Sequence, residues 1–162
     1  MSNTATLSYA WAPIGRQPVI MCKQKGKERQ TMFGSLNYRT GQITVSFAER
    51  GNYESFKKHL KKVLRAYPSA KKLIMYMDNV RYHHAKKLKS FLAIHGRLEI
   101  KYLPPYSPDL NPIERAWWYM RKKITHNRFL LTLKERKGLF WRMFSHFLKP
   151  NEELKIVCNL NY

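Results

Sequence analysis

The sequence predicts an α/β protein in which a mixed β-sheet is flanked by helices. Two observations lead to this class. An alternating segment at 42–48 predicts a half-buried strand, and the continuous apolar segment at 73–77 predicts a strand that is covered on both faces. These strands are interleaved with two segments, 52–67 and 81–95, whose apolar residues recur at helical spacing. Strands that alternate with helices in this way are typical of sheets with parallel pairs.

The composition is that of a folded protein with a large positive charge. The 162 residues suffice for one domain with a sizeable core, and a hydrophobic fraction of 44% excludes a disordered chain. Lys and Arg number 31 against 10 Asp and Glu, which gives a net charge of +21. Because such an excess repels itself, we expect a polyanionic partner, with nucleic acid first. The alternative is a cationic surface that only keeps the protein in solution.

Cysteine usage and hydropathy predict a cytoplasmic protein without a membrane partner. The two cysteines are too few for a disulfide framework and have no zinc-site spacing. No apolar run approaches the roughly 18 residues of a membrane span, and the first residues do not resemble a signal peptide.

The first half of the chain predicts a hairpin followed by a helix. Segments 31–38 and 42–48 read as antiparallel strands joined by a turn at Gly41, where glycine can adopt a positive φ. In segment 52–67, Phe56, Leu60 and Val63 form one apolar stripe, and lysines occupy the other faces. The next strand, 73–77, ends on Asp78.

The second half predicts a helix at 81–95, a strand at 98–103 and a further helix after a stiff proline-rich loop. Asn111 is a natural N-cap for that last helix, and Glu114 then falls at its third position. Beyond it, segment 130–148 predicts one helix that is interrupted near Gly138, and 149–162 predicts a weakly ordered end.

Asp78 and Glu114 are the candidate catalytic and metal-binding residues. Ligands gather at the carboxyl ends of strands in sheets of this kind, where Asp78 lies. Enough residues separate the two acids for a helix, a strand and a loop, so Glu114 can return to the same edge. Converging carboxylates suit Mg²⁺ or Mn²⁺, which hold the attacking and leaving oxygens in metal-dependent phosphoryl transfer.

Simpler interpretations exist for each of these acids and for their neighbours. Asn111 and Glu114 have capping-box spacing, and Asp78 alone could be a turn acid. Asp109 is better explained as a loop acid than as a ligand. Three histidines invite a metal hypothesis but are better explained as solvated helix residues: His83, His84 and His95.

Two strings of residues closely resemble the catalytic core of mariner-like insertion-sequence transposases. The strings are Met77-Asp78-Asn79 with His83, and Leu103-Pro-Pro-Tyr-Ser-Pro-Asp-Leu-Asn-Pro-Ile-Glu114-Arg-Ala-Trp117. The segment Trp-Ala-Pro-Ile-Gly at 11–15 is also similar to a loop of that family, so the resemblance covers roughly residues 9–127. It implies a DDE endonuclease with an RNase H-like fold, in which Asp78 is the second catalytic acid and Glu114 the third.

The sequence departs from the family pattern at the first catalytic acid. The resemblance places that Asp on a first, central strand, but no Asp or Glu precedes Glu28 here. The family's N-terminal helix-turn-helix domain has no counterpart either. We therefore expect an RNase H-like mixed sheet without its first strand, the C-terminal part of a transposase. We expect residues 1–128 to form the truncated endonuclease domain, and 129–162 to form a C-terminal helix and tail packed on it.

The functional prediction that follows is a transposase endonuclease domain for metal-dependent DNA cleavage and strand transfer. The isolated chain is expected to be inactive because the first acid is absent. The implied partners are DNA, as transposon ends and target, and either an upstream transposase fragment or a second copy in a homodimer. The implied location is the bacterial cytoplasm, with association to the nucleoid when bound to DNA. The alternative is a catalytically dead, DNA-binding remnant that interferes with intact transposase.

Overall fold

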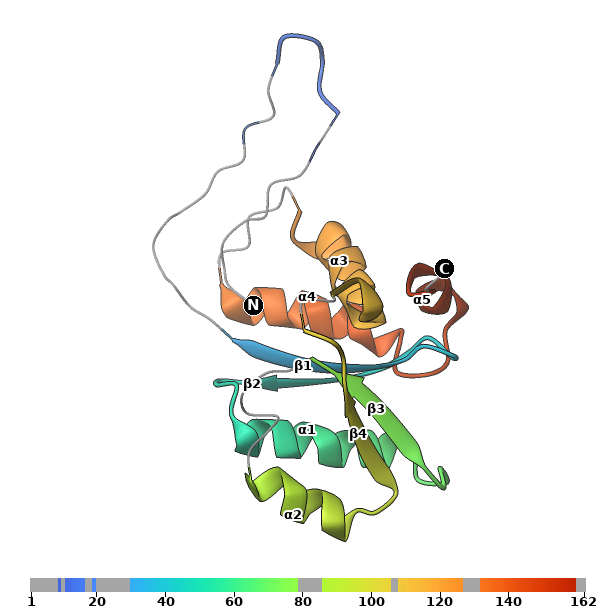
Figure 1. Ribbon diagram of the computed structural model, residues 1–162. Helices are drawn as coiled ribbons and strands as arrows, with labels where there is room; N and C mark the ends of the chain where they lie inside the picture. The colour runs from blue at the N-terminus through green and yellow to red at the C-terminus, as the bar shows by residue number, and fades with distance from the viewer. Residues whose placement is uncertain are drawn as a thin grey trace.

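The computed structural model describes residues 9, 11–16, 19, 30–78, 86–105, 108–126 and 132–159. A β-hairpin forms the middle layer, with α1 and α2 on one side and α3, α4 and α5 on the other (Figure 1). The elements are β1 (Thr31–Asn37), β2 (Gln42–Ala48), α1 (Tyr53–Ala66), β3 (Leu73–Met77), α2 (Lys86–Ile94), β4 (Leu98–Tyr102), the 3₁₀ turn η2 (Pro108–Leu110), α3 (Pro112–Ile124), α4 (Leu133–Ser145) and α5 (Glu152–Val157).

The hairpin confirms the antiparallel pairing predicted for its two strands. The register runs from Thr31 opposite Ala48 to Asn37 opposite Gln42. The turn between them needs Gly41, which has a φ of +67°. Its amide donates to the carbonyl of Asn37 at 2.8 Å, so the reversal is closed by a backbone hydrogen bond.

The second strand pair is parallel and forms a separate sheet. Strand β3 pairs with β4 from Leu73 opposite Leu98 to Met77 opposite Tyr102, and the Leu103 amide extends the ladder to the Met77 carbonyl at 2.9 Å. Within the described parts of the chain, no strand joins this pair to the hairpin. The mixed sheet is therefore divided into an antiparallel and a parallel half.

The prediction that segment 73–77 is covered on both faces is wrong. Ile74 and Tyr76 are 47% and 58% exposed, whereas Met77 is buried. Alternate residues of a strand face opposite sides, so one side of β3 packs against the α1–α2 core. The other side, which carries Ile74 and Tyr76, stays exposed although every residue of the strand is apolar.

Two buried clusters hold the layers together, one on each side of the hairpin. The lower cluster joins β1 to α1, α2, β3 and β4 through Phe33, Phe56, Leu60, Leu64, Met77, Leu88, Phe91 and Leu98. The upper cluster joins β2 to the three C-terminal helices through Ile43, Val45, Ala116, Met120, Ile124, Phe140, Phe144, Phe147, Leu154 and Cys158. The hairpin thus packs against a buried cluster on each face and lies at the centre of the molecule.

Polar groups complete the free edge of β2 and the end of α1. The Lys62 ammonium donates to the Val45 carbonyl at 2.7 Å, and the Ile43 amide donates to the Phe147 carbonyl at 2.8 Å. At the end of α1, the Arg97 guanidinium donates to four backbone carbonyls, those of Leu64, Tyr67, Pro68 and Ala70. These contacts provide partners for backbone groups at the edge of β2 and for carbonyls at and just after the end of α1.

The C-terminal region is more ordered than predicted. Helix α4 continues through Gly138 without interruption, since the burial of Phe140 and Phe144 outweighs the roughly 1 kcal/mol that a helical glycine costs. Helix α5 forms where a weakly ordered end was expected. Its N-cap Asn151 accepts a hydrogen bond from the Leu154 amide at 2.9 Å, and Leu154 itself is fully buried.

Candidate active site

Asp78 lies directly after β3, at the carboxyl edge of the parallel strand pair. Its side chain is exposed, whereas that of the preceding Met77 is buried and anchors the strand end in the lower cluster. Because β3 and β4 are parallel, the chain that leaves β4 starts from the same edge. That chain leads through η2 into α3.

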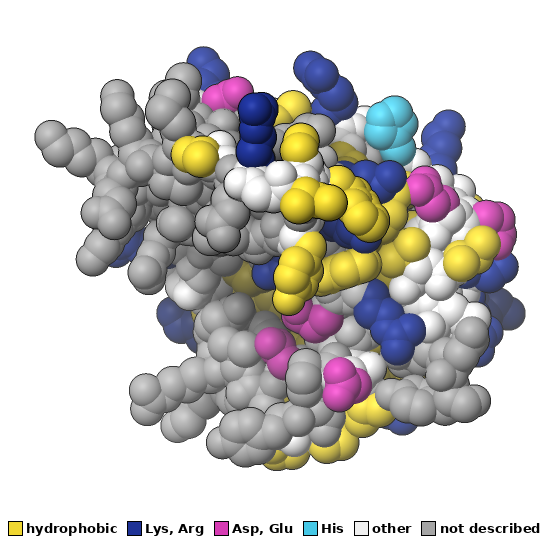
Figure 2. Space-filling model, turned by 90° about the horizontal axis from the view of Figure 1, so that it is seen from above, with side chains coloured by type: hydrophobic (Ala, Val, Ile, Leu, Met, Phe, Trp, Pro, Cys, Tyr) yellow, Lys and Arg dark blue, Asp and Glu magenta, His cyan; other side chains and the backbone are white. Residues whose placement is uncertain are grey.

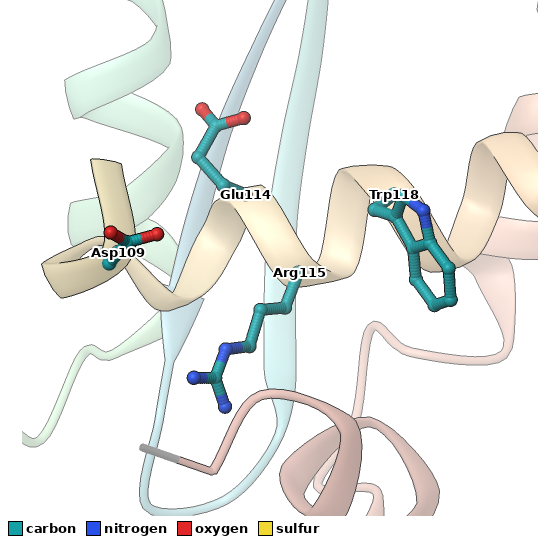
Figure 3. Close-up of a pocket in the computed structure, with 4 residues that line it drawn as sticks. All are labelled: Asp109, Glu114, Arg115 and Trp118. Atoms are coloured by element: carbon teal, nitrogen blue, oxygen red, sulfur yellow. The ribbon is translucent and has the colours of Figure 1, made fainter. Parts of the chain in front are cut away.

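Glu114 lies in the first turn of α3 and its side chain is exposed. Pro112 opens the helix, and the Glu114 amide donates to the Asn111 carbonyl at 3.0 Å. Asn111 is the N-cap residue as predicted, but its side chain makes no capping hydrogen bond, so the alternative interpretation of Asn111 and Glu114 as a capping box is not supported. Figure 3 shows the Glu114 carboxylate on the side of the helix opposite to Arg115, and among the described residues it forms no ion pair.

A close contact between β1 and α3 fixes the height of the helix above the hairpin. An added Cβ at Gly34 would lie 2.3 Å and 2.4 Å from two indole carbons of Trp117 and 2.9 Å from Cδ1 of Ile113. Only glycine leaves room for the ring at this point of the strand. Since Ile113 directly precedes Glu114, this contact also positions the carboxylate.

We expect Gly34→Ala to destabilise the protein by about 1–3 kcal/mol, the usual cost of overpacking, and to displace α3. Urea unfolding measures the loss of stability. The double variant Gly34→Ala/Trp117→Leu removes the ring from the contact and should cost less than the sum of the two single variants. Additive costs would contradict the contact.

A shallow pocket of about 260 Å³ adjoins Glu114, lined by Asp109, Glu114, Arg115 and Trp118. The four side chains come from η2 and the first two turns of α3 (Figure 3). The Arg115 guanidinium donates to the Asn159 carbonyl, which holds it toward the end of α5. In the view from above, acidic side chains lie near one another beside exposed apolar ones (Figure 2).

The other candidate ligands have different surroundings. Asp109 lies in η2 and borders the pocket, close in sequence to α3. The His95 ring lies 4.4 Å from that of Phe91 at the end of α2, far along the chain from either acid. His83 and His84 lie outside the described residues. Among those that are described, no three His, Cys, Asp or Glu side chains group as a metal site would require.

The donor chemistry of Asp78 and Glu114 suits a divalent metal. Both are exposed carboxylates, and Mg²⁺ takes oxygen ligands while it keeps several of its waters. Two protein carboxylates with waters are therefore a chemically suitable, though small, ligand set.

Sequence reasoning missed two polar contacts that connect the elements around the site. His59 of α1 is buried against the hairpin, with its ring nitrogens 2.8 Å and 2.9 Å from the hydroxyl oxygens of Ser35 and Ser46. Tyr119 donates to the Glu153 carboxylate, a contact that ties α5 to α3 and raises the pKa of Tyr119 to about 12. The only sequence signal for His59 was its place on the apolar stripe of α1.

The basic surface predicted for α1 is present. Lys58, Lys61 and Arg65 are exposed on this helix, as are Lys87 and Lys89 on α2. Lys62 is different, because it turns inward to the edge of β2. No helix among the described residues is long and apolar enough to cross a membrane.

The fold is an RNase H-like α/β fold. It matches the fold of Mos1 transposase in its paired-end complex with the left transposon end, with a TM-score of 0.71 at 14% identity, over 96% of this chain and 47% of that one. The Mos1 mariner paired-end complex with Mn matches with a TM-score of 0.70 at 15% identity, over 94% of this chain and 47% of that one. At this identity the likeness concerns the fold.

The chain belongs to the DDE superfamily endonuclease family, whose sequence model matches residues 1–137. It is 26% identical over 117 residues to the insertion element IS630 39 kDa protein of Shigella sonnei, which covers 72% of this chain and 34% of that one. It is 28% identical over 97 residues to the y4pE/y4sA protein of Sinorhizobium fredii, and this match covers 60% of this chain and 69% of that one. These matches confirm the predicted resemblance to mariner-like insertion-sequence transposases. The chain spans about a third of the Shigella protein and about half of the Mos1 chains.

Proposed function

We propose that this chain carries the second and third catalytic acids, Asp78 and Glu114, of a transposase that cleaves DNA and joins strands. The observation that carries the proposal is the placement of the two acids. One follows a strand of the parallel pair, and the other opens the helix that the chain reaches from the same edge of that pair. The match of the chain to the DDE superfamily endonucleases supports the same chemistry.

Asp78 and Glu114 would hold Mg²⁺ or Mn²⁺. Bound there, the metal supplies charge stabilisation for the attacking and leaving oxygens at phosphorus. The part of this chain is to present the two carboxylates from a strand end and a helix start. Manganese, with which one of the matching Mos1 complexes was formed, is a metal of the same class.

The chain alone is expected to cleave DNA poorly. A DDE site takes three acids, and the sequence supplies two at matching positions. The partner would be an upstream transposase fragment that brings the first acid, or a second copy of the chain. The DNA partners would be transposon ends and target DNA, held by phosphate contacts from α1 and α2 that weaken steeply with salt.

The test measures Mg²⁺-dependent nicking of plasmid DNA by the chain with an upstream fragment that carries the first acid. We expect Asp78→Asn and Glu114→Gln to reduce nicking by at least about 100-fold. Even mutation of residues that only hydrogen-bond to metal ligands lowers metal affinity or activity by up to about 100-fold. Glu135→Gln is the matched control, because Glu135 has the same position in the first turn of α4 that Glu114 has in α3. Its nicking should equal that of the wild type.

Three outcomes would contradict parts of the proposal. Full nicking by Asp78→Asn or Glu114→Gln would remove the assigned residues from the site. Strong nicking by the chain alone would refute the need for a further acid. DNA binding that is indifferent to Mg²⁺ and to Asp78→Ala, without nicking in any combination, would favour a DNA-binding remnant instead.

A further inference from the structure

Two adjacent tryptophans of α3 have opposite environments. Trp117 packs over Gly34 on β1 and against Phe144 of α4, with ring centroids 5.8 Å apart. Trp118 is 52% exposed and lines the pocket beside Glu114. The packing of the helix on the hairpin therefore accounts for Trp117 and leaves Trp118 without a structural role.

Trp118 lies one helical turn after Glu114, about 6 Å further along the axis. Residues four positions apart lie on neighbouring turns of a helix, and both Glu114 and Trp118 line the pocket. A nucleotide whose phosphate is held at this site by the divalent metal of the proposed function would have its neighbouring base within the same pocket as the ring.

One ammonium lies over the indole, and one guanidinium lines the same pocket. The Lys122 ammonium lies 5.1 Å from the centroid of the ring, and Arg115 lines the pocket on the same helix. An aromatic face combined with basic side chains is the arrangement with which proteins bind single-stranded nucleic acid, because every base offers a π-face and every nucleotide a phosphate.

We propose that Trp118 is a stacking platform for an unpaired base next to the phosphate at which the chain acts. The inference rests on the proposed function, since it assigns the DNA at that site a single-stranded or flipped nucleotide. Within a duplex, both faces of a base are covered by its neighbours, so only an unpaired base can stack on the ring. Trp118 is thus a positioning residue that selects melted DNA at the site.

The test compares two labelled DNAs by fluorescence anisotropy in Mg²⁺, a blunt duplex and the same duplex with a short single-stranded extension. The wild-type chain should bind the extended duplex more tightly. Trp118→Leu should lose about 5- to 150-fold of affinity for the extended duplex, the range that stacking of one base supports, with little change for the blunt one. Trp118→Tyr keeps a π-face and should retain most of the preference.

Trp141 of α4 provides the matched control. It is 43% exposed and has the Lys62 ammonium 5.0 Å from its ring centroid, but it does not line the pocket. Trp141→Leu should keep the preference for the extended duplex. An extension of abasic nucleotides should bind to the wild type as weakly as the natural extension binds to Trp118→Leu.

The outcomes separate this inference from the proposed function. Equal binding of both DNAs by the wild type, or an equal loss on both in Trp118→Leu, overturns the stacking role while duplex binding stands. A preference that Trp118→Leu retains also overturns it. Failure of the wild type to bind either DNA overturns the proposed function, and the inference with it.

Discussion

Gly41→Ala is expected to lower the free energy of unfolding by about 3 kcal/mol or more. An alanine at a φ of +67° costs roughly 1–2 kcal/mol by itself. Its Cβ would also lie 2.1 Å from the Asn151 carbonyl oxygen and 2.6 Å from the Lys155 amide nitrogen. These are backbone atoms of the start of α5 and cannot rotate away. The turn and the helix must separate, which breaks the hydrogen bond from the Asn151 amide to the Thr40 carbonyl.

Urea unfolding followed by circular dichroism measures this loss. Gly138→Ala is the matched control, because nothing lies within 4 Å of an added Cβ there and the residue is inside α4. That variant should be more stable than the wild type by about 0.5–1 kcal/mol, the helical advantage of alanine over glycine. A wild-type midpoint for Gly41→Ala would show that the hairpin turn does not rest on α5.

Acidification is expected to destabilise the protein through His59. Burial lowers the pKa of His59 from 6.5 to about 4, and the nearby Lys62 charge acts in the same direction. Between pH 6.5 and pH 4, the unfolded chain therefore binds a proton at this residue that the folded chain does not bind. The associated stability is complete above pH 6.5 and is lost as the pH falls toward 4, by about 3 kcal/mol in all.

The measurement is the free energy of unfolding of the wild type and of His59→Gln across this pH range. The other titrating groups contribute equally to both proteins, so the difference between the two pH profiles isolates His59. We expect the wild-type profile to be steeper below pH 6.5. Parallel profiles would mean that the ring is protonated in the folded state.

The local elements could be predicted because their signals are local. Alternation at 42–48 and the apolar stripe of α1 depend on periodicity alone, and both elements have nearly the predicted bounds. Whether both faces of β3 are covered could not be predicted. Apolar residues allow a strand face to be buried, but they do not show that a helix packs over it. The unbroken α4 likewise depends on aromatic packing across the molecule rather than on the residues around Gly138.

For the candidate site, the sequence allowed residues to be proposed but not the contacts that position them. Asp78 and Glu114 could be chosen because acids are scarce in this chain and a specific motif surrounds them. The role of Gly34 could not be predicted, because the indole that fills the space beside it belongs to Trp117, 83 positions further along the chain. The failure of the Asn111 cap is of the same kind, because spacing permits a capping hydrogen bond without requiring it.

The Lys62 contact limits where a further strand could pair with the hairpin. With the Val45 carbonyl and the Ile43 amide both occupied, an incoming chain finds no ladder to continue along β2. Any strand that this sheet recruits must therefore line up along β1.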